Sequence, residues 1–413
     1  MIARPGGLVR DVAVTGLGLI TPAGIGVDAN WATLCAARST ATADPALEGR
    51  SVNFSCRALD FDADGVLGRR VAWRLDRFSQ LAVAAARQAV ADAGLDSSSW
   101  DGARVAVVVG NSLGGSQTWE KQHQVMMRSG IDAVSALTVP MAMLNMVAGA
   151  VSIDLGAHGP SLVAATACAS GASAIGIARD LLLADSADVV IAGGAESAIS
   201  PFIMGSLDRL GGLSRRSLDP STASRPFDRD RDGFVAGEGA GILVLERPDD
   251  ARARRARVRA RVQGFAASCD AYHPTAPDPT GSAAVSAIRL ALQDAHVQPN
   301  DVDHINAHGT STPLNDVTEA RAIRAVYGDR PIVTSTKGVT GHTLGAAGAI
   351  EAAYTILAVQ SDEIPPTANL DTVDPAVDLD IVHTSPRRAA VEVATSHSFG
   401  FGGHNAVVVL TAA

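Results

Sequence analysis

Cysteine and aromatic residues are scarce in this chain of 413 residues. The four cysteines, Cys35, Cys56, Cys168 and Cys269, form no CxxC pair, so neither a zinc ribbon nor a disulfide framework is indicated. A reducing, cytoplasmic setting is therefore expected. Aromatic residues make up 4% of the chain, whereas glycine occurs 40 times. A core with so few large rings requires helices to approach a sheet closely.

Long apolar runs are also missing. No stretch approaches the roughly 18 consecutive apolar residues that indicate a membrane-spanning helix. Near the N-terminus, Asp11 interrupts the apolar core that a signal peptide would need. We therefore predict no membrane association and no targeting segment.

Positive charge is limited and unevenly distributed. The formal net charge is −9, which argues against general nucleic-acid binding. Lysine occurs only twice, as Lys121 and Lys337, and Lys337 lies within a glycine-rich segment. The arginine-rich residues 252–262 are predicted to form a solvated strand face, because arginine alternates with apolar residues in the second half of this run.

Short β-branched runs alternate with alanine-rich helical stretches along the chain. These runs lie at 104–112, 187–197, 240–246, 304–312, 331–338 and 405–411. Continuous apolar runs bounded by glycine are typical of strands buried on both faces. The pattern predicts a layered α/β fold.

One helical pattern occurs twice. Residues 83–95 (VAAARQAVADAGL) and 285–297 (VSAIRLALQDAHV) share Val, Ala, Arg, Ala, Asp and Ala at matching positions. Each copy is followed by a polar loop and an apolar strand that ends in a turn of small residues. Two similar alanine-rich helices are one explanation, and a duplicated half-domain is the other. We favour duplication and predict halves at 1–255 and 256–413.

Cys168 lies between an expected strand and an expected helix, within the small residues of VAATACASGAS. A helix N-terminus offers unpaired N–H groups and partial positive charge, which favour a thiolate at this position. Ala169, Ser170 and Gly171 leave room for a substrate or another backbone segment. An ordinary buried cysteine is the alternative.

Three further segments contain residues suited to chemistry. His308 follows a strand in NAHGTST, and residues 396–406 form the glycine-rich turn SHSFGFGGHNA. The segment STKGVTGHTLGAAGAIEAA contains Lys337, His342 and Glu351. Its helix is expected to be buried all round, so Lys337 and Glu351 need charged partners, and we predict that they pair with each other.

Taken together, these segments resemble the elongating β-ketoacyl-acyl carrier protein synthases of the KAS II type, within the thiolase fold superfamily. The resemblance covers essentially the whole chain and includes VAVTGLGLITPAG, TACASG, ADVVIAGGAES, SRPFDRDRDGFVAGEGAG, SDEIPPTANLD and GFGGHN. Two features depart from the family pattern: a proline-rich loop at 269–281, and His397, where asparagine is more usual. The resemblance implies five layers, α-β-α-β-α, in two pseudo-repeated halves.

The family's reaction is a decarboxylative Claisen condensation. The resemblance implies that Cys168 takes the acyl chain and that malonyl-carrier protein supplies the attacking enolate. His308 and His342 would donate hydrogen bonds to that enolate, Lys337 would orient His308, and Glu351 would neutralise Lys337. Backbone N–H groups of Cys168 and Phe401 would bind the oxyanion, and the Phe401 ring would gate access to the thiol.

The resemblance also assigns the residues that bind substrate and carrier protein. The expected substrate contacts are Thr310 or Thr312, with Thr275, for the malonyl group, Leu113 at the end of the acyl pocket, and Gly400 and Gly402 beside Phe401. Gly403 also flanks the Phe401 gate. Arg69, Arg70 and Arg74 match the docking region for the acidic carrier protein. No free cofactor or metal is expected, because the substrates are held on the carrier's phosphopantetheine.

Other functions fit these residues less well. The stretch 228–239 begins like an EF-hand loop, but its twelfth residue is Gly239 rather than an acid, which makes a calcium site improbable. Cys168, His308 and His342 lack short metal-ligand spacing, and a Cys–His protease would not explain the second histidine or Lys337. A non-catalytic, chain-length-determining subunit resembles this family but lacks the nucleophile. Fatty acid and type II polyketide synthesis stay open, as do a homodimer and a heterodimer with such a subunit.

Overall fold

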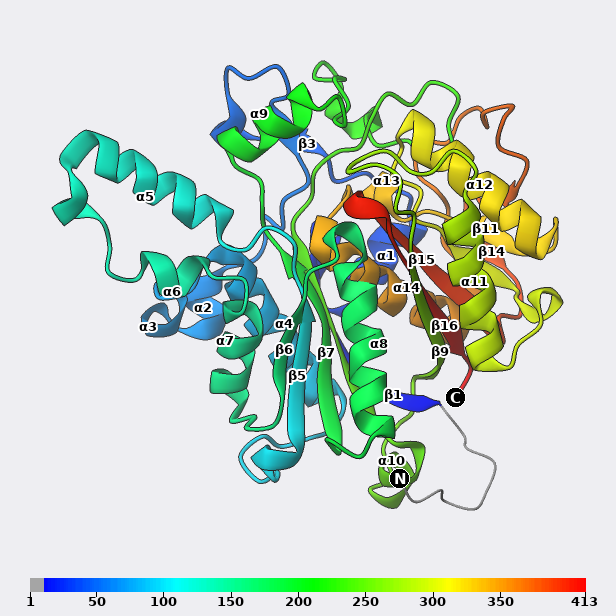
Figure 1. Cartoon of the computed structure of the whole chain (residues 1–413), viewed down its shortest axis with the longest axis horizontal. Coiled ribbons are helices and arrows are strands. Elements are labelled where there is room, and N and C mark those ends of the chain that lie inside the picture. The colour runs from blue at the N-terminus through cyan, green and yellow to red at the C-terminus, as the bar shows by residue number, and fades with distance from the viewer. Residues whose placement is uncertain (1–10) are drawn as a thin grey trace.

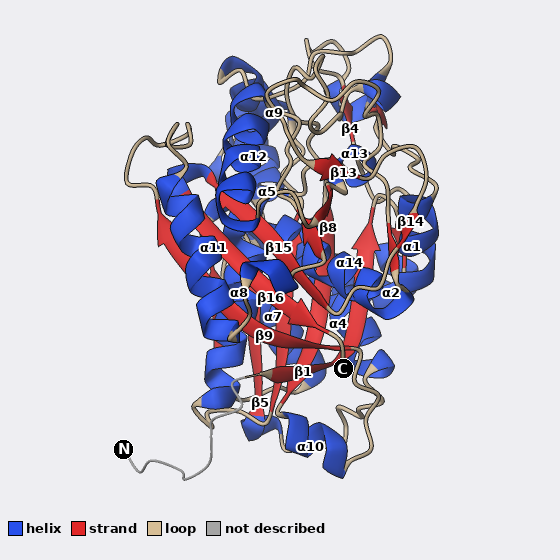
Figure 2. Ribbon diagram, turned by 90° about the vertical axis from the view of Figure 1, so that its right-hand side faces the viewer, coloured by secondary structure: helices blue, strands red, loops and turns tan. Residues whose placement is uncertain are grey.

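Two half-sheets form the centre of the molecule in the computed structural model, which describes residues 11–413 (Figures 1 and 2). In the first, the spatial order is β6-β5-β7-β8-β1, and in the second it is β11-β10-β15-β16-β9. The strands of the first are β1 (Val12–Thr21), β5 (Val105–Gly110), β6 (Ser161–Ala164), β7 (Val189–Glu196) and β8 (Gly239–Glu246). The strands of the second are β9 (Ala260–Cys269), β10 (His304–Asn306), β11 (Ile332–Thr334), β15 (Val393–Gly400) and β16 (His404–Thr411).

The two half-sheets have the same topology. In each, the first strand pairs antiparallel with the fifth, the fifth antiparallel with the fourth, and the fourth and third each lie parallel to the second. Strands β1 and β9 also pair with each other over three residues, which joins the halves into one continuous sheet. The predicted pseudo-repeat is confirmed. The boundary between residues 255 and 256 stays a prediction.

Helices fill the remaining three layers. The outer face of the first half-sheet is covered by α4 (Arg77–Asp92) and α7 (Met146–Leu155), and that of the second by α11 (Ser282–Ala295) and α12 (Pro313–Tyr327). Between the half-sheets lie α8 (Ser170–Leu183) and α14 (Ala347–Ser361), which contact both of them and each other. The repeated sequence pattern belongs to α4 and α11, which pack on equivalent strands, β1 and β9.

Glycine permits the close approach that the composition predicts. A Cβ atom on Gly18 of β1 would lie 1.9 Å from the Ala85 carbonyl oxygen of α4. On the opposite side of the molecule, a Cβ atom on Gly264 of β9 would lie 2.7 Å from the Ala291 oxygen of α11. Real Cβ atoms do not approach so closely, so α4 and α11 reach their strands only because these positions lack side chains.

The other elements are short or peripheral. They are α1 (Val27–Cys35), α2 (Ala63–Leu67), α3 (Arg69–Ala72), α5 (Ser116–Ser129), α6 (Thr138–Ala142), α9 (Pro201–Arg209), α10 (Pro248–Ala253), α13 (Lys337–Thr340), β2 (Gly24–Ile25), β3 (Thr42–Ala43), β4 (Phe54–Ser55), β12 (Glu363–Ile364), β13 (Asp380–Ile381) and β14 (Arg387–Arg388). Helix α5 projects from the body at the left of Figure 1 and has no buried residue.

The fold bears on two predictions, one about the arginine-rich residues 252–262 and one about membrane-spanning helices. Arg259 is buried and binds Asp92, so the solvated strand face predicted for 252–262 is wrong at this position. Arg254 and Arg261 of the same run bind Glu246 and Asp11. Over residues 11–413, none of the helices is both long and apolar enough to cross a bilayer. The prediction that the N-terminus has no targeting segment also concerns residues 1–10, which lie outside the residues that the structure describes.

Candidate active site

Cys168 lies on a tight turn between β6 and α8. The turn Ala167–Ala169 is a single 3₁₀ turn, and Ala167 has a left-handed φ of +50°. The hydroxyl of Ser170 closes the turn by accepting from the N–H of Thr166 at 2.9 Å and donating to the Ala167 carbonyl at 2.6 Å. This turn directs Cys168, which is only 8% exposed, toward the second half of the molecule.

The second half contains an equivalent turn. Leu344–Ala346 is a 3₁₀ turn directly before α14, and Leu344 has a φ of +49°. His342 precedes this turn, and its backbone is held by Val235 and Gly237 on the segment leading into β8. The two helix N-termini therefore place the cysteine of one half beside a histidine of the other.

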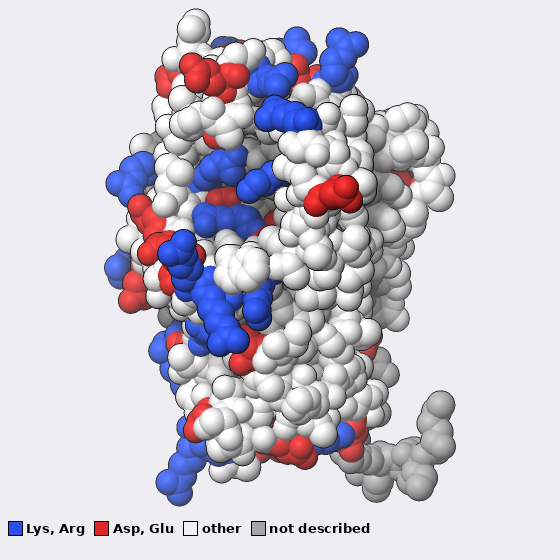
Figure 3. Space-filling model, turned by 90° about the vertical axis from the view of Figure 1, so that its left-hand side faces the viewer, with Lys and Arg blue, Asp and Glu red and all other residues white. Residues whose placement is uncertain are grey.

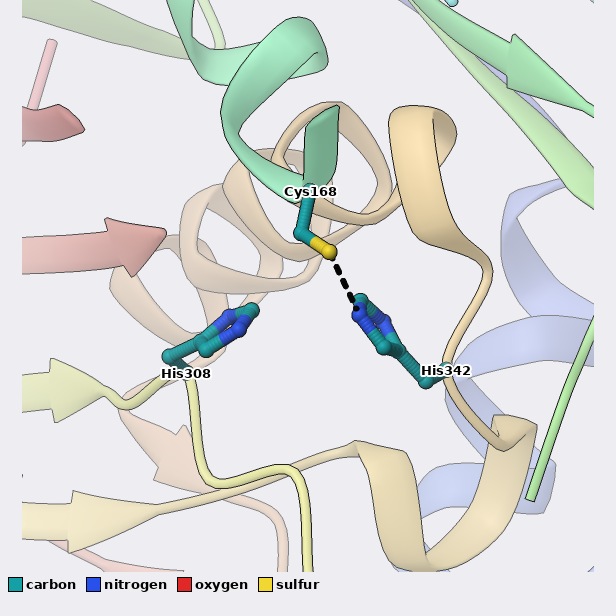
Figure 4. Close-up of side chains that lie close together, drawn as sticks. All are labelled: Cys168, His308 and His342. Carbon is teal, nitrogen blue, oxygen red and sulfur yellow. Dashed lines mark hydrogen bonds between the residues drawn. The ribbon is translucent and has the colours of Figure 1, made fainter. Parts of the chain in front are cut away.

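Three predicted side chains converge at this point (Figure 4). Sγ of Cys168 lies 3.0 Å from Nε2 of His342. His308 comes from the turn after β10, and its ring stands edge-on to the ring of His342 with 5.3 Å between the centroids. One donor atom from each of the three residues lies within 4.8 Å of the other two.

Lys337 and Glu351 lie behind His308 and are both buried. Nζ of Lys337 donates to the backbone carbonyl of His308 at 2.6 Å and lies 3.4 Å from its Nδ1 atom. The same ammonium group binds the Glu351 carboxylate of α14. The predicted pairing is confirmed, and it supplies the opposite charge that a buried ammonium group requires.

Burial dominates the electrostatics of the site. It lowers the pKa of both His308 and His342 well below the ordinary value, and the nearby Lys337 charge lowers both further. Both imidazoles are therefore neutral at pH 7, with one N–H group each. Burial also raises the pKa of Cys168 to about 11, although the Phe401 N–H and Lys337 act in the opposite direction. The expected thiolate is therefore wrong for the free protein at neutral pH.

A cavity of about 630 Å³ leads to Cys168. Its lining includes the predicted residues Leu113, Thr275, Thr310, Thr312, Gly400 and Phe401, together with His308 and His342. The hydroxyl oxygens of Thr310 and Thr312 lie 2.9 Å apart. Gly402 is not part of this lining; its N–H group donates to the carbonyl of Pro274 in the proline-rich loop.

Two residues of the site are not among those predicted from the sequence. Phe399 lines the cavity beside His308, with 6.0 Å between the ring centroids. Glu319 of α12 is buried, and its two oxygens accept the backbone N–H groups of His308 and Gly309 at 2.7 Å each. The spacing of Asp316 and Glu319, one turn apart on the apolar face of α12, was an available signal.

The three converging donor atoms also resemble a metal ligand set. Zinc accepts cysteine and histidine, with bonds of about 2.0–2.3 Å to four ligands. Cys168, His308 and His342 provide three such groups, but the Lys337 ammonium group lies 3.4 Å from His308 and disfavours a cation there. The absence of a metal stays a prediction.

The predicted docking arginines lie away from the cavity lining. Arg69 and Arg70 belong to α3, and the Arg74 guanidinium lies over the exposed ring of Trp73, 5.5 Å from its centroid. None of the three arginines has an acidic partner within 4.0 Å among residues 11–413. Figure 3 shows basic side chains gathered on the side of the molecule that includes α3 and α5.

Two family models match this chain. The N-terminal domain of β-ketoacyl synthase matches residues 9–251, and the C-terminal domain matches residues 259–371. The chain belongs to the β-ketoacyl synthase family. It is thus a condensing acyltransferase, and the Cys–His protease alternative is excluded.

Curated relatives and solved structures agree with the family. The chain is 44% identical to 3-oxoacyl-[acyl-carrier-protein] synthase 2 of Synechocystis over 96% of both chains, and 41% identical to the Staphylococcus aureus protein of the same name over 97% and 98%. It superposes on the ishigamide ketosynthase/chain length factor with a TM-score of 0.92, 35% identity and coverage of 98% and 100%. Superposition on a β-ketoacyl synthase from Burkholderia phymatum gives a TM-score of 0.91 at 34% identity and covers 97% of this chain and 99% of that chain.

The pKa of Cys168 predicts how this β-ketoacyl synthase reacts with an alkylating agent. Only the thiolate reacts, and below a pKa of about 11 its fraction rises about tenfold for each pH unit. We expect the rate of Cys168 carboxamidomethylation by iodoacetamide to rise steadily from pH 7 to pH 9. Peptide mass spectrometry distinguishes Cys168 from the exposed Cys269. A rate that is already constant at pH 7 would contradict the prediction.

Proposed function

We propose that Cys168 is the nucleophile that accepts an acyl chain from a carrier-bound thioester. The thiol sulfur forms the new thioester bond, the bond to the phosphopantetheine sulfur breaks, and the proton of Cys168 leaves with the departing thiol. Two features support this role: the N–H of Phe401 donates to the Cys168 sulfur, and Nε2 of His342 lies 3.0 Å from it. The backbone N–H groups of Cys168 and Phe401 would bind the oxyanion.

The second half of the reaction uses malonyl-carrier protein. Loss of carbon dioxide leaves a thioester enolate, which attacks the acyl carbonyl on Cys168 and releases the thiolate. His308 and His342 would each donate an N–H to the enolate oxygen, which fits two neutral imidazoles better than a base–acid pair. Lys337 would hold His308 in place, and Thr310 or Thr312, with Thr275, would meet the malonyl carboxylate.

Phe401 is proposed to gate the cavity. Its ring lines the cavity and is 37% exposed, while Gly402 and Gly403 beside it have left-handed φ values of +81° and +75°. Glycine adopts such angles without strain, so this turn can change conformation at low cost. A structure of the acylated protein with an unmoved Phe401 ring would contradict the gate.

An acidic carrier protein is the proposed partner. Arg69, Arg70 and Arg74 offer positive charge that no acid in the described part of the chain neutralises. The solved complex of a type II polyketide acyl-carrier protein with its ketosynthase matches the chain with a TM-score of 0.90 at 32% identity. The substrates would arrive on phosphopantetheine, without a free cofactor, in the cytoplasm. Leu113 at the cavity wall has a side chain of moderate size, which supports a preference for medium or long acyl chains.

A dimer is proposed through the open edge of the first half-sheet. Among residues 11–413, strand β6 ends the sheet and its outer N–H and C=O groups have no neighbouring strand, and Leu162 on it is 43% exposed. Helix α5 and the exposed Ile153 of α7 extend the same region. The partner is a second copy or a chain-length subunit, as in the solved ketosynthase in complex with its chain length factor from Xenorhabdus doucetiae.

The convergence of Cys168, His308 and His342 is the observation that supports the proposed mechanism, and single substitutions test it. With acyl-carrier and malonyl-carrier protein, we expect Cys168→Ala to take up no acyl group and to lose condensation. His308→Ala should still be acylated but slow decarboxylation by about 10²-fold or more, because an enolate donor is lost. Intact mass spectrometry measures acylation of Cys168, and released carbon dioxide measures decarboxylation. The length of the acyl chain that Cys168 accepts assigns the pathway. Condensation by Cys168→Ala would disprove the mechanism.

Charge reversal tests the docking surface. We expect Arg70→Glu combined with Arg74→Glu to raise the KM for acyl-carrier protein about tenfold or more, with kcat little changed, because the surface is separate from the reacting atoms. Arg289→Glu, an exposed arginine on α11, is the matched control and should leave KM unchanged. Equal effects of both variants would contradict a specific docking surface.

Solution mass tests the dimer. We expect twice the mass of one chain for the protein alone or for its complex with a chain-length paralogue. Leu162→Asp should reduce this mass, because a charge on the β6 edge opposes pairing of two edges. A wild-type chain that stays monomeric alone and with such paralogues would contradict the proposal.

A further inference from the structure

A buried carboxylate outside the proposed reaction steps fixes the His308 turn. Glu319 accepts one backbone N–H on each oxygen, from His308 and from Gly309. Both bonds are 2.7 Å long, which is typical of charge-assisted hydrogen bonds. These two hydrogen bonds hold the backbone of His308 in place. The backbone in turn sets the position from which the imidazole side chain extends.

His397 of β15 faces the same carboxylate. Its ring is fully buried, and Nδ1 lies 3.7 Å from Oε1 of Glu319, which is beyond hydrogen-bond length but within ion-pair range. Within residues 11–413, no other histidine, lysine or arginine side chain places a nitrogen within 4.0 Å of the Glu319 carboxylate. The amide of Asn315 donates to the other oxygen of Glu319, Oε2, at 3.5 Å, so His397 is the contact on the Oε1 side that comes from a different strand.

Two hydroxyl groups orient the imidazole of His397. Nε2 lies 3.3 Å from the Tyr327 hydroxyl and 3.2 Å from the Thr395 hydroxyl, whereas Nδ1 has no hydrogen-bond partner. Hydroxyl groups that donate to Nε2 leave the ring proton on Nδ1, where it points to Glu319. Tyr327 also stacks on the ring with 6.1 Å between the centroids, which restricts its rotation.

Other charged groups near Glu319 show why an N–H donor from His397 is useful there. Asp316 lies on the same helix and Glu351 lies behind His308, and the Glu319 charge contributes to the raised pKa of each of these two acids. Lys337 is occupied by Glu351 and by the His308 carbonyl. An N–H group directed at Glu319 stabilises its carboxylate.

We propose that His397 is a positioning residue: its Nδ1–H keeps Glu319 on the His308–Gly309 turn and thereby aligns His308 for malonyl decarboxylation. The catalytic consequence rests on the proposed function of His308. In the proposed mechanism, acyl transfer to Cys168 depends instead on the N–H of Phe401 and on His342. Loss of the His397 donor should therefore affect one half-reaction and not the other.

The test compares His397→Leu with His397→Asn. Leucine removes the donor, whereas the asparagine amide places an N–H near the position of Nδ1. We expect His397→Leu to slow carbon dioxide release from malonyl-carrier protein by about tenfold or more while acylation of Cys168 keeps its wild-type rate. Amide hydrogen exchange at 304–312 should accelerate in the same variant. His397→Asn should restore both decarboxylation and exchange protection.

His304→Leu is the matched control. His304 is a second buried histidine, on the neighbouring strand β10, and its Nδ1 contacts the Ile332 carbonyl at 2.9 Å. This control should change neither half-reaction selectively. If His397→Leu does not fold, Glu319→Gln replaces it, and the same selective loss is expected because one acceptor oxygen is removed.

The proposal is overturned by unchanged decarboxylation and exchange in the donor-free variant, by equal loss of both half-reactions, or by asparagine behaving like leucine. Failure of the wild-type protein to decarboxylate malonyl-carrier protein would refute the proposed function instead. Hydrogen exchange at 304–312 still decides the positioning role in that case, because it measures the Glu319 contact without any substrate.

Discussion

The close crossing of α8 and α14 is the constraint on which the site depends. A Cβ atom on Gly171 would lie 2.6 Å from the Ala349 nitrogen, and one on Gly348 would lie 2.8 Å from the Ala172 nitrogen. Side chains at either glycine would push the two helices apart. Because the turns with Cys168 and His342 directly precede these helices, such a displacement would separate the sulfur from the imidazole that now lies 3.0 Å away.

The duplicated topology divides the chemistry between the halves. The first half provides Cys168 on the turn before its central helix, where the acyl group would be held. The second half provides His342 before the equivalent turn, and His308 after the strand that corresponds to β5. One half thus presents the nucleophile and the other presents donors for the enolate, at an interface covered by both half-sheets.

Burial gives the site its electrostatic character. Removing water keeps both histidines neutral, and Glu351 compensates the ammonium group of Lys337, so His308 lies next to a fixed positive charge without becoming charged itself. Glu319 adds a second buried carboxylate that holds the His308 backbone. The hydrogen bonds from Lys337 and to Glu319 hold the His308 segment in place, which suits a site that must stabilise charge as it develops.

The sequence by itself determined the α/β class, the internal repeat, the identity of Cys168, His308, His342 and Lys337, and the partnership of Lys337 with Glu351. These follow from local pattern, from resemblance, and from the rule that buried charges pair. Only the tertiary structure shows the raised pKa of Cys168, because its main cause is burial, which a sequence pattern does not reveal. It also decided the meeting of Glu319, His397 and the His308 turn. Glu319 follows the His308 turn by only 11 residues, but His397 comes from β15, and only tertiary packing brings it to the carboxylate.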